Sequence, residues 1–86
     1  MKQFKFLVTD SVGIHARPAG LLVKSASRFS CMLTMKKSDG KSANLKKLFN
    51  VMGMGVKSGD YVTVIAEGED EDAAIQQIKT VFEDNL

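Results

Sequence analysis

Two kinds of apolar pattern follow one another along the 86 residues of this chain, and their order restricts the folds that it can adopt. Short stretches with strand patterns, either alternating apolar residues or runs rich in β-branched ones, lie at residues 2–8, 31–36 and 61–66, and a short strand is expected at residues 41–43, after a hairpin turn. Longer stretches with the three- and four-residue apolar spacing of amphipathic helices lie at residues 16–28, 45–52 and 71–82. The expected order is therefore strand, helix, strand, strand, helix, strand, helix.

Each expected helix has a single apolar stripe, which has to be buried against another layer. The most economical arrangement is an α+β fold, a two-layer open-faced β-sandwich in which a mostly antiparallel four-stranded sheet carries all three helices on one face. The opposite face should stay exposed, as its polar residues indicate: Lys5, Thr34, Lys36 and Thr63. Three apolar residues fit such a face less well, namely Leu7, Met32 and Ile65. We expect residues 1–86 to form a single domain.

Turn and cap residues mark the limits of the expected elements. The segment Ser38-Asp39-Gly40 predicts a hairpin between the second and third strands. Asn44 is a good N-cap for the second helix, whose apolar residues begin at Leu45 and which Gly53 closes. Asp70 can cap the last helix in the same way.

The composition is that of an ordinary globular protein, with 44% apolar and 26% charged residues. No apolar run approaches the length of a membrane span and no signal peptide is visible, so we expect a cytoplasmic protein without membrane insertion. With one histidine and one cysteine, we expect no metal site, no cofactor and no internal disulfide. Cys31 is expected to be a small core residue rather than a reactive thiol.

The net charge of +2 is distributed unevenly. Lysines gather between residues 36 and 57, whereas acidic residues gather between residues 67 and 72. The two groups could simply be solvated faces. The alternative is that the lysines form a basic surface for an acidic partner.

The most distinctive segment runs from Gly13 to Ala19 and contains the only histidine and the only proline. Pro18 predicts a helix that begins near Ala16, because proline is tolerated in the first turn of a helix. His15 then lies at the helix N-terminus, where free N–H groups and the helix dipole favour an anion and a neutral, nucleophilic imidazole. Arg17 adds a planar set of donors suited to phosphate oxygens. These residues favour phosphoryl transfer through His15 itself.

Other chemistries fit the sequence less well. A serine hydrolase would need a Gly-x-Ser-x-Gly motif, and the glycines between residues 53 and 59 lack the spacing of a phosphate-binding loop. The lysines leave some support for nucleic-acid binding, but the chain has few aromatic residues for base stacking. The simplest alternative for His15 is an ordinary surface histidine. Two interpretations also exist for Leu48, Phe49 and Met52, which could form a core stripe or an exposed contact for a partner.

Over essentially its whole length the chain resembles HPr, the histidine-containing phosphocarrier family of the bacterial phosphoenolpyruvate-dependent sugar phosphotransferase system. The segment from Gly13 to Ala19 carries most of this likeness, and residues 46–55 and 66–71 support it. The resemblance implies an open-faced β-sandwich that holds a phosphorylated histidine at the start of its first helix. It also implies a phosphocarrier rather than an enzyme.

The resemblance further implies that His15 accepts a phosphoryl group on Nδ1 from phosphorylated enzyme I and passes it to a histidine of a sugar-specific enzyme IIA. Arg17 would contact this group, and the amides of Ala16 and Arg17 would help to hold it. The family's partner-binding surface, an apolar patch with a basic rim, corresponds to Ala16, Arg17, Gly20, Lys24, Leu48, Phe49 and Met52. We expect a monomer without a nucleic-acid partner, because a carrier offers one face to successive proteins.

Two features depart from the family pattern. Many members carry a regulatory serine at the start of the second helix, where this chain has Lys47. Lysine cannot be phosphorylated by a serine kinase, and its charge is opposite to that of phosphoserine, so we expect a carrier without that serine switch. One extra residue near Lys36 to Asp39 is expected only to lengthen the hairpin. The alternative function is a regulatory HPr-like module that acts by binding another protein rather than by obligatory phosphoryl transfer.

Overall fold

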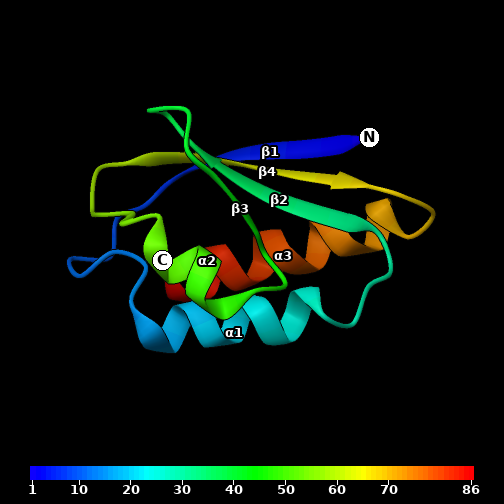
Figure 1. Ribbon diagram of the computed structural model, residues 1–86, viewed down its shortest axis with the longest axis horizontal. Helices are drawn as coiled ribbons and strands as arrows, with labels where there is room; N and C mark the ends of the chain where they lie inside the picture. Colours follow the sequence, from blue (N-terminus) through cyan, green and yellow to red (C-terminus); the bar gives the residue numbers. More distant parts are fainter.

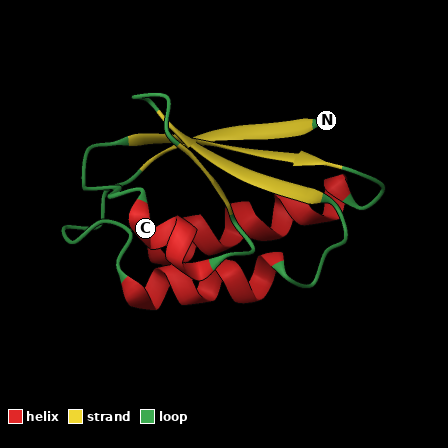
Figure 2. Cartoon of the chain, in the orientation of Figure 1, coloured by secondary structure: helices red, strands yellow, loops and turns green.

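The computed structural model describes residues 1–86, in which one four-stranded sheet lies over three helices (Figure 1). The elements follow the expected order and are β1 (Lys2–Leu7), α1 (Ala16–Ala26), β2 (Met32–Lys37), β3 (Ser42–Asn44), α2 (Leu48–Gly53), β4 (Tyr61–Glu67) and α3 (Glu71–Asn85). All three helices lie on the same side of the sheet, and its other face is open (Figure 2). The predicted open-faced α+β sandwich is therefore confirmed.

All strand pairs in the sheet are antiparallel, and the strand order is β1-β4-β2-β3. The central strand β4 pairs with both β1 and β2 and buries every second residue. Phe4 of β1 and Met35 of β2 both lie opposite Val64, which aligns the inward-facing side chains of three strands. The short β3 pairs with β2 alone and directs Ala43 into the core.

The core lies between the sheet and the helices and contains 21 buried apolar residues, with no buried polar or charged side chain. Phe82 of α3 makes edge-to-face contacts with Phe4 and Phe6 of β1, and the ring centroids are 5.6 and 5.3 Å apart. These contacts fix α3 beneath β1, and α1 packs against α3 in turn. None of the helices combines the length and the apolar character that crossing a membrane requires.

The expected start of the second helix, with Asn44 as N-cap and Leu45 as its first apolar residue, is wrong. Asn44 ends β3, and its side-chain oxygen accepts a hydrogen bond from the Lys46 N–H at 2.9 Å. Leu45 is fully buried, and its N–H donates to the Leu33 carbonyl at 2.9 Å. Asn44 therefore stabilises a turn next to the sheet, and α2 begins only at Leu48.

Other expected limits differ by one to three residues, the largest difference being the end of α3 at Asn85 rather than at residue 82. The first helix ends at Ala26 rather than near Arg28, because the Arg28 N–H bonds the carbonyl three residues back instead of four. β2 extends to Lys37 and β3 to Asn44, since hydrogen bonds between Lys37 and residues 40 and 41 close the hairpin turn.

Asp70 precedes α3 as expected, but its side chain does not cap that helix. Its carboxylate instead accepts hydrogen bonds from the backbone N–H groups of Ser30 and Cys31 at 2.8 and 2.9 Å. The Ser30 amide, as the main donor, holds the pKa of Asp70 below its usual value. Asp70 thus ties the start of α3 to the turn that precedes β2.

Cys31 is buried and free, as expected of a core residue. Burial raises the pKa of its thiol to about 11, and the neighbouring Asp70 adds to this shift. A thiol with this pKa stays protonated at neutral pH and is a poor nucleophile. The Cys31 backbone also lies against Gly68, where an added Cβ would be 2.8 Å from the Cys31 Cα.

Replacing Asp70 with Asn should lower the free energy of unfolding near pH 7 and have a smaller effect near pH 2. The pKa of Asp70 is lowered in the folded state, so its contribution is complete above the ordinary value of 3.8 and is lost as the pH falls through the folded-state value. Urea unfolding at both pH values measures the difference. Asp72→Asn, in the exposed first turn of α3, is the control, and equal losses in the two variants would contradict this role of Asp70.

Candidate functional site

The segment before α1 is held by its own backbone and by the loop that follows α2. The carboxylate of Asp10 accepts a hydrogen bond from the Val12 N–H at 2.9 Å, and its carbonyl accepts one from the Gly13 N–H at 3.0 Å. The N–H of Ile14 donates to the Val56 carbonyl at 3.0 Å, and the Ile14 side chain is buried. These contacts fix the backbone immediately before His15.

Gly13 has a left-handed φ of 75° and lies directly against the backbone of residues 56 and 57. A Cβ at this position would contact the Val56 carbonyl oxygen and would lie 2.8 Å from the Lys57 Cα. Glycine alone satisfies both the backbone conformation and the close approach.

His15 is the N-cap residue of α1, which confirms the helix start that Pro18 predicts. Its backbone is extended, and its carbonyl accepts the first helical hydrogen bond from the Ala19 N–H at 3.0 Å. Pro18 and Ala19 are buried and anchor the first turn in the core. The imidazole is exposed and makes no capping bond, so this side chain stands free on a fixed backbone.

The first turn of α1 offers hydrogen-bond donors beside this imidazole. The N–H groups of Ala16 and Arg17 donate to no backbone or side-chain acceptor of the chain, as is usual in a first helical turn. The Arg17 side chain is exposed and takes part in none of the four ion pairs of the structure. No acidic residue lies in this turn. Its donors and the helix dipole suit an anion bound next to His15.

His15 and Arg17 line a shallow pocket of about 290 Å³. Its remaining walls are Asp10, Pro18, Leu21, Asp84 and Asn85. Leu21 lies one turn after Arg17 and is 41% exposed, so the helical spacing could have indicated it. No sequence pattern indicates Asp84 and Asn85, because only the packing of α1 against α3 brings the end of α3 to this pocket (Figure 1).

α2 packs beside α1 and carries an exposed apolar group. Phe49 is 83% exposed, and Leu48 and Met52 are partly exposed, whereas Val51 is buried. The interpretation of these three residues as a core stripe is therefore wrong. Together with exposed Ala16, Arg17 and Lys24 and half-buried Gly20 on α1, they form what we call the α1–α2 surface.

Lys47 is the N-cap residue of α2, but its side chain makes no capping bond. It is exposed and belongs to no ion pair. A positive charge at a helix N-terminus is unfavourable for that helix, so Lys47 adds to the basic charge around the α1–α2 surface without stabilising α2.

An exposed histidine at a helix N-terminus, on a small sandwich with shallow surface pockets, defines a protein suited to carry an anionic group at its surface. Over residues 2–84 the chain matches the protein family described as "PTS HPr component phosphorylation site". The chain therefore belongs to the HPr phosphocarrier family of the phosphotransferase system.

Individual relatives agree with this assignment. The chain is 46% identical over 84 residues to the phosphocarrier protein HPr of Mycoplasma capricolum subsp. capricolum, a match that covers 98% of this chain and 93% of the relative. A solved histidine-containing phosphocarrier protein of Mycoplasma has a TM-score of 0.93 at 46% identity, covering 96% of this chain and 93% of that one. Crh of Bacillus subtilis, described as a dimer with a swapped domain, has a TM-score of 0.77 at 36% identity, covering 100% and 98%. The predictions of the family, of the fold and of a phosphocarrier rather than an enzyme are confirmed.

Replacing Gly13 with Ala should destabilise the protein by about 2 kcal/mol or more, because alanine adds left-handed strain and a contact with the Val56 and Lys57 backbone. Urea unfolding measures the loss. Gly53→Ala is the control, since a Cβ there meets open space at the end of α2 and should cost nothing. Equal stability of Gly13→Ala and the wild type would contradict the close approach at Val56.

Proposed function

We propose that His15 accepts a phosphoryl group on Nδ1 from phosphorylated enzyme I and donates it to a histidine of enzyme IIA of the sugar phosphotransferase system. The main support is the exposed His15 imidazole at the N-terminus of α1, beside donors that lack partners. In each transfer the accepting ring nitrogen attacks phosphorus, and the bond between phosphorus and the donor group breaks. Neither step consumes a cofactor.

Positive and negative groups around His15 would have opposite effects on the phosphorylated ring, so that the phosphoryl group is bound without being held too tightly. The amides of Ala16 and Arg17 and the guanidinium of Arg17 would bind the phosphoryl oxygens. Asp10 and Asp84 line the same pocket, and their carboxylates would repel the phosphoryl charge. Such a balance suits a carrier, which has to bind its group and then release it.

For partner recognition we propose the α1–α2 surface. Phe49 is its most exposed apolar residue and would serve as the anchor. Arg17, Lys24 and Lys47 would form a cationic rim, and none of them is engaged in an ion pair within the chain. Acidic rims on enzyme I and enzyme IIA would complement these charges, and a small interface would allow fast release.

We propose in addition that the family's serine switch is missing. Lys47 occupies the N-cap of α2, at the position that corresponds to the regulatory serine. It cannot accept a phosphoryl group from a serine kinase, and it contributes the opposite charge. The carrier would act as a monomer in the cytoplasm, because successive partners have to reach the same face. The free Cys31 fits such a reducing compartment.

A second candidate function is that of a regulatory module that binds another protein without obligatory phosphoryl transfer. The similarity to Crh, which is described as a catabolite repression protein, favours this candidate. The unpaired Arg17 beside an exposed His15 favours the carrier, since binding alone would not need this pair.

Incubating the wild-type protein with phosphoenolpyruvate and enzyme I should add one acid-labile phosphoryl group per chain, which mass spectrometry detects. His15→Ala should remain unlabelled. Phe49→Ala should be labelled on the order of tenfold more slowly because it lacks the apolar anchor. Met32→Ala, which removes a 69% exposed side chain from the open sheet face, should be labelled at the wild-type rate.

An unchanged mass of the wild-type protein would exclude the carrier role. The regulatory module predicts a different result in a pull-down of partner proteins, where His15→Ala would retain binding and Phe49→Ala would lose it.

A further inference from the structure

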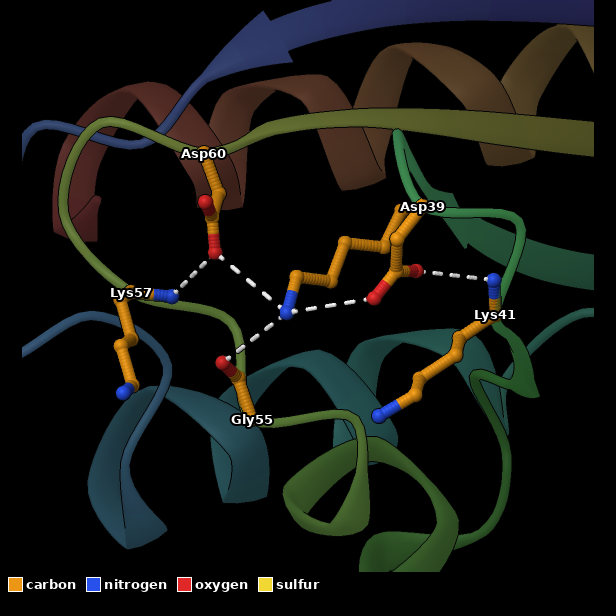
Figure 3. Close-up of polar contacts among 6 residues, drawn as sticks. Asp39, Lys41, Gly55, Lys57 and Asp60 are labelled. Carbon is orange, nitrogen blue, oxygen red and sulfur yellow. Dashed lines mark hydrogen bonds and ion pairs between the residues drawn. The ribbon is translucent and has the colours of Figure 1, made fainter.

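The mostly buried side chain of Lys37 joins the hairpin turn to the loop between α2 and β4. Its ammonium nitrogen lies 3.7 Å from a carboxylate oxygen of Asp39 in the hairpin turn and 3.6 Å from one of Asp60 before β4. It also donates to the carbonyl of Gly55, in the loop after α2, at 3.4 Å. Figure 3 shows the two carboxylates and this carbonyl converging on one nitrogen. The Lys37 side chain is only 16% exposed, so solvent screens its charge less than at an open surface, whereas the side chains of Asp39 and Asp60 are 44% and 30% exposed.

Both carboxylates are themselves held by backbone donors. Asp39 accepts a hydrogen bond from the Lys41 N–H at 3.0 Å, and Asp60 accepts one from the Lys57 N–H at 2.9 Å (Figure 3). The Lys41 amide, as the main cause, lowers the pKa of Asp39. The cluster therefore links the hairpin turn firmly to the segment from residue 55 to residue 60, which we call the 55–60 loop.

The 55–60 loop supports the segment that leads into His15. Gly55 directly precedes Val56, whose carbonyl accepts the Ile14 N–H. Asp60 bonds the backbone of Lys57, and the Lys57 Cα lies against Gly13. Because Ile14 directly precedes His15, a continuous set of contacts runs from Lys37 to the N-cap of α1.

We infer that Lys37 is a positioning residue for His15, because its ammonium group holds the 55–60 loop against which the backbone before His15 is fixed. The extra residue near Lys36 to Asp39, expected only to lengthen the hairpin, lies in the segment that supplies the ammonium group and one of its carboxylates. This role rests on the proposed phosphocarrier function, since positioning matters only if His15 reacts.

Lys37→Met keeps most of the apolar stem and removes the charge. In this variant we expect the hydrogen-exchange rate of the Ile14 amide, divided by that of the Val64 amide in the central strand, to rise on the order of tenfold above the wild-type value. A general loss of stability would accelerate both amides equally. Lys36→Met changes the neighbouring exposed lysine, which has no ion pair, and should leave the ratio of the Ile14 to the Val64 exchange rate at its wild-type value. Lys37→Arg keeps the positive charge and should return this ratio most of the way to the wild-type value.

Phosphoryl acceptance from enzyme I provides the second measurement. Lys37→Met should lower the maximal rate on the order of fivefold at an unchanged half-saturating concentration, because the reacting geometry is loosened while the α1–α2 surface stays intact. If the wild type accepts a phosphoryl group and Lys37→Met equals Lys36→Met in either the exchange ratio or the maximal rate, the positioning role is overturned. A wild type that accepts no phosphoryl group would instead overturn the phosphocarrier function, while the exchange ratio would still show whether Lys37 holds the Ile14 contact.

Discussion

The hydrogen bond from the Ile14 N–H to the Val56 carbonyl, made where Gly13 lies against the neighbouring backbone, is the contact on which the site depends. It fixes the chain one residue before His15 and leaves the imidazole without any capping bond. Rigid support and a free side chain are both needed for the proposed role of His15, in which the residue would react with two different proteins. The two backbones can approach so closely because Gly13 has no Cβ, and glycine also tolerates the left-handed φ at this position.

The one-sided architecture explains why the functional residues gather at the helices. Because all three helices cover the same face of the sheet, α1 packs against both α2 and α3. The contact with α2 places that helix, with its exposed Phe49, beside α1, and the contact with α3 brings Asp84 into the His15 pocket. One small layer of helices therefore supplies an exposed histidine, its charged surroundings and an exposed apolar surface.

Features with local causes were predictable from the sequence, whereas features with long-range causes were not. The start of α1 follows from Pro18, whose effect is confined to its own turn. Asn44 misled the placement of α2, because an asparagine favours a helix cap and a turn through the same side-chain hydrogen bond. Asp70 stands at the expected position, yet its partners lie far away in the sequence. The extra residue near Lys36 to Asp39 did not indicate the role of Lys37, since that role arises only where the hairpin turn meets the distant 55–60 loop.

The central claim is that a phosphoryl group on His15 Nδ1 is held by the first turn of α1. Nuclear magnetic resonance of the ¹⁵N-labelled protein, before and after phosphorylation by enzyme I, tests it most directly. We expect the ring signals of a histidine phosphorylated at Nδ1, together with the largest amide shifts at Ala16 and Arg17. Phosphorylation at Nε2 or at another residue, or unchanged amides in the first turn of α1, would contradict this claim.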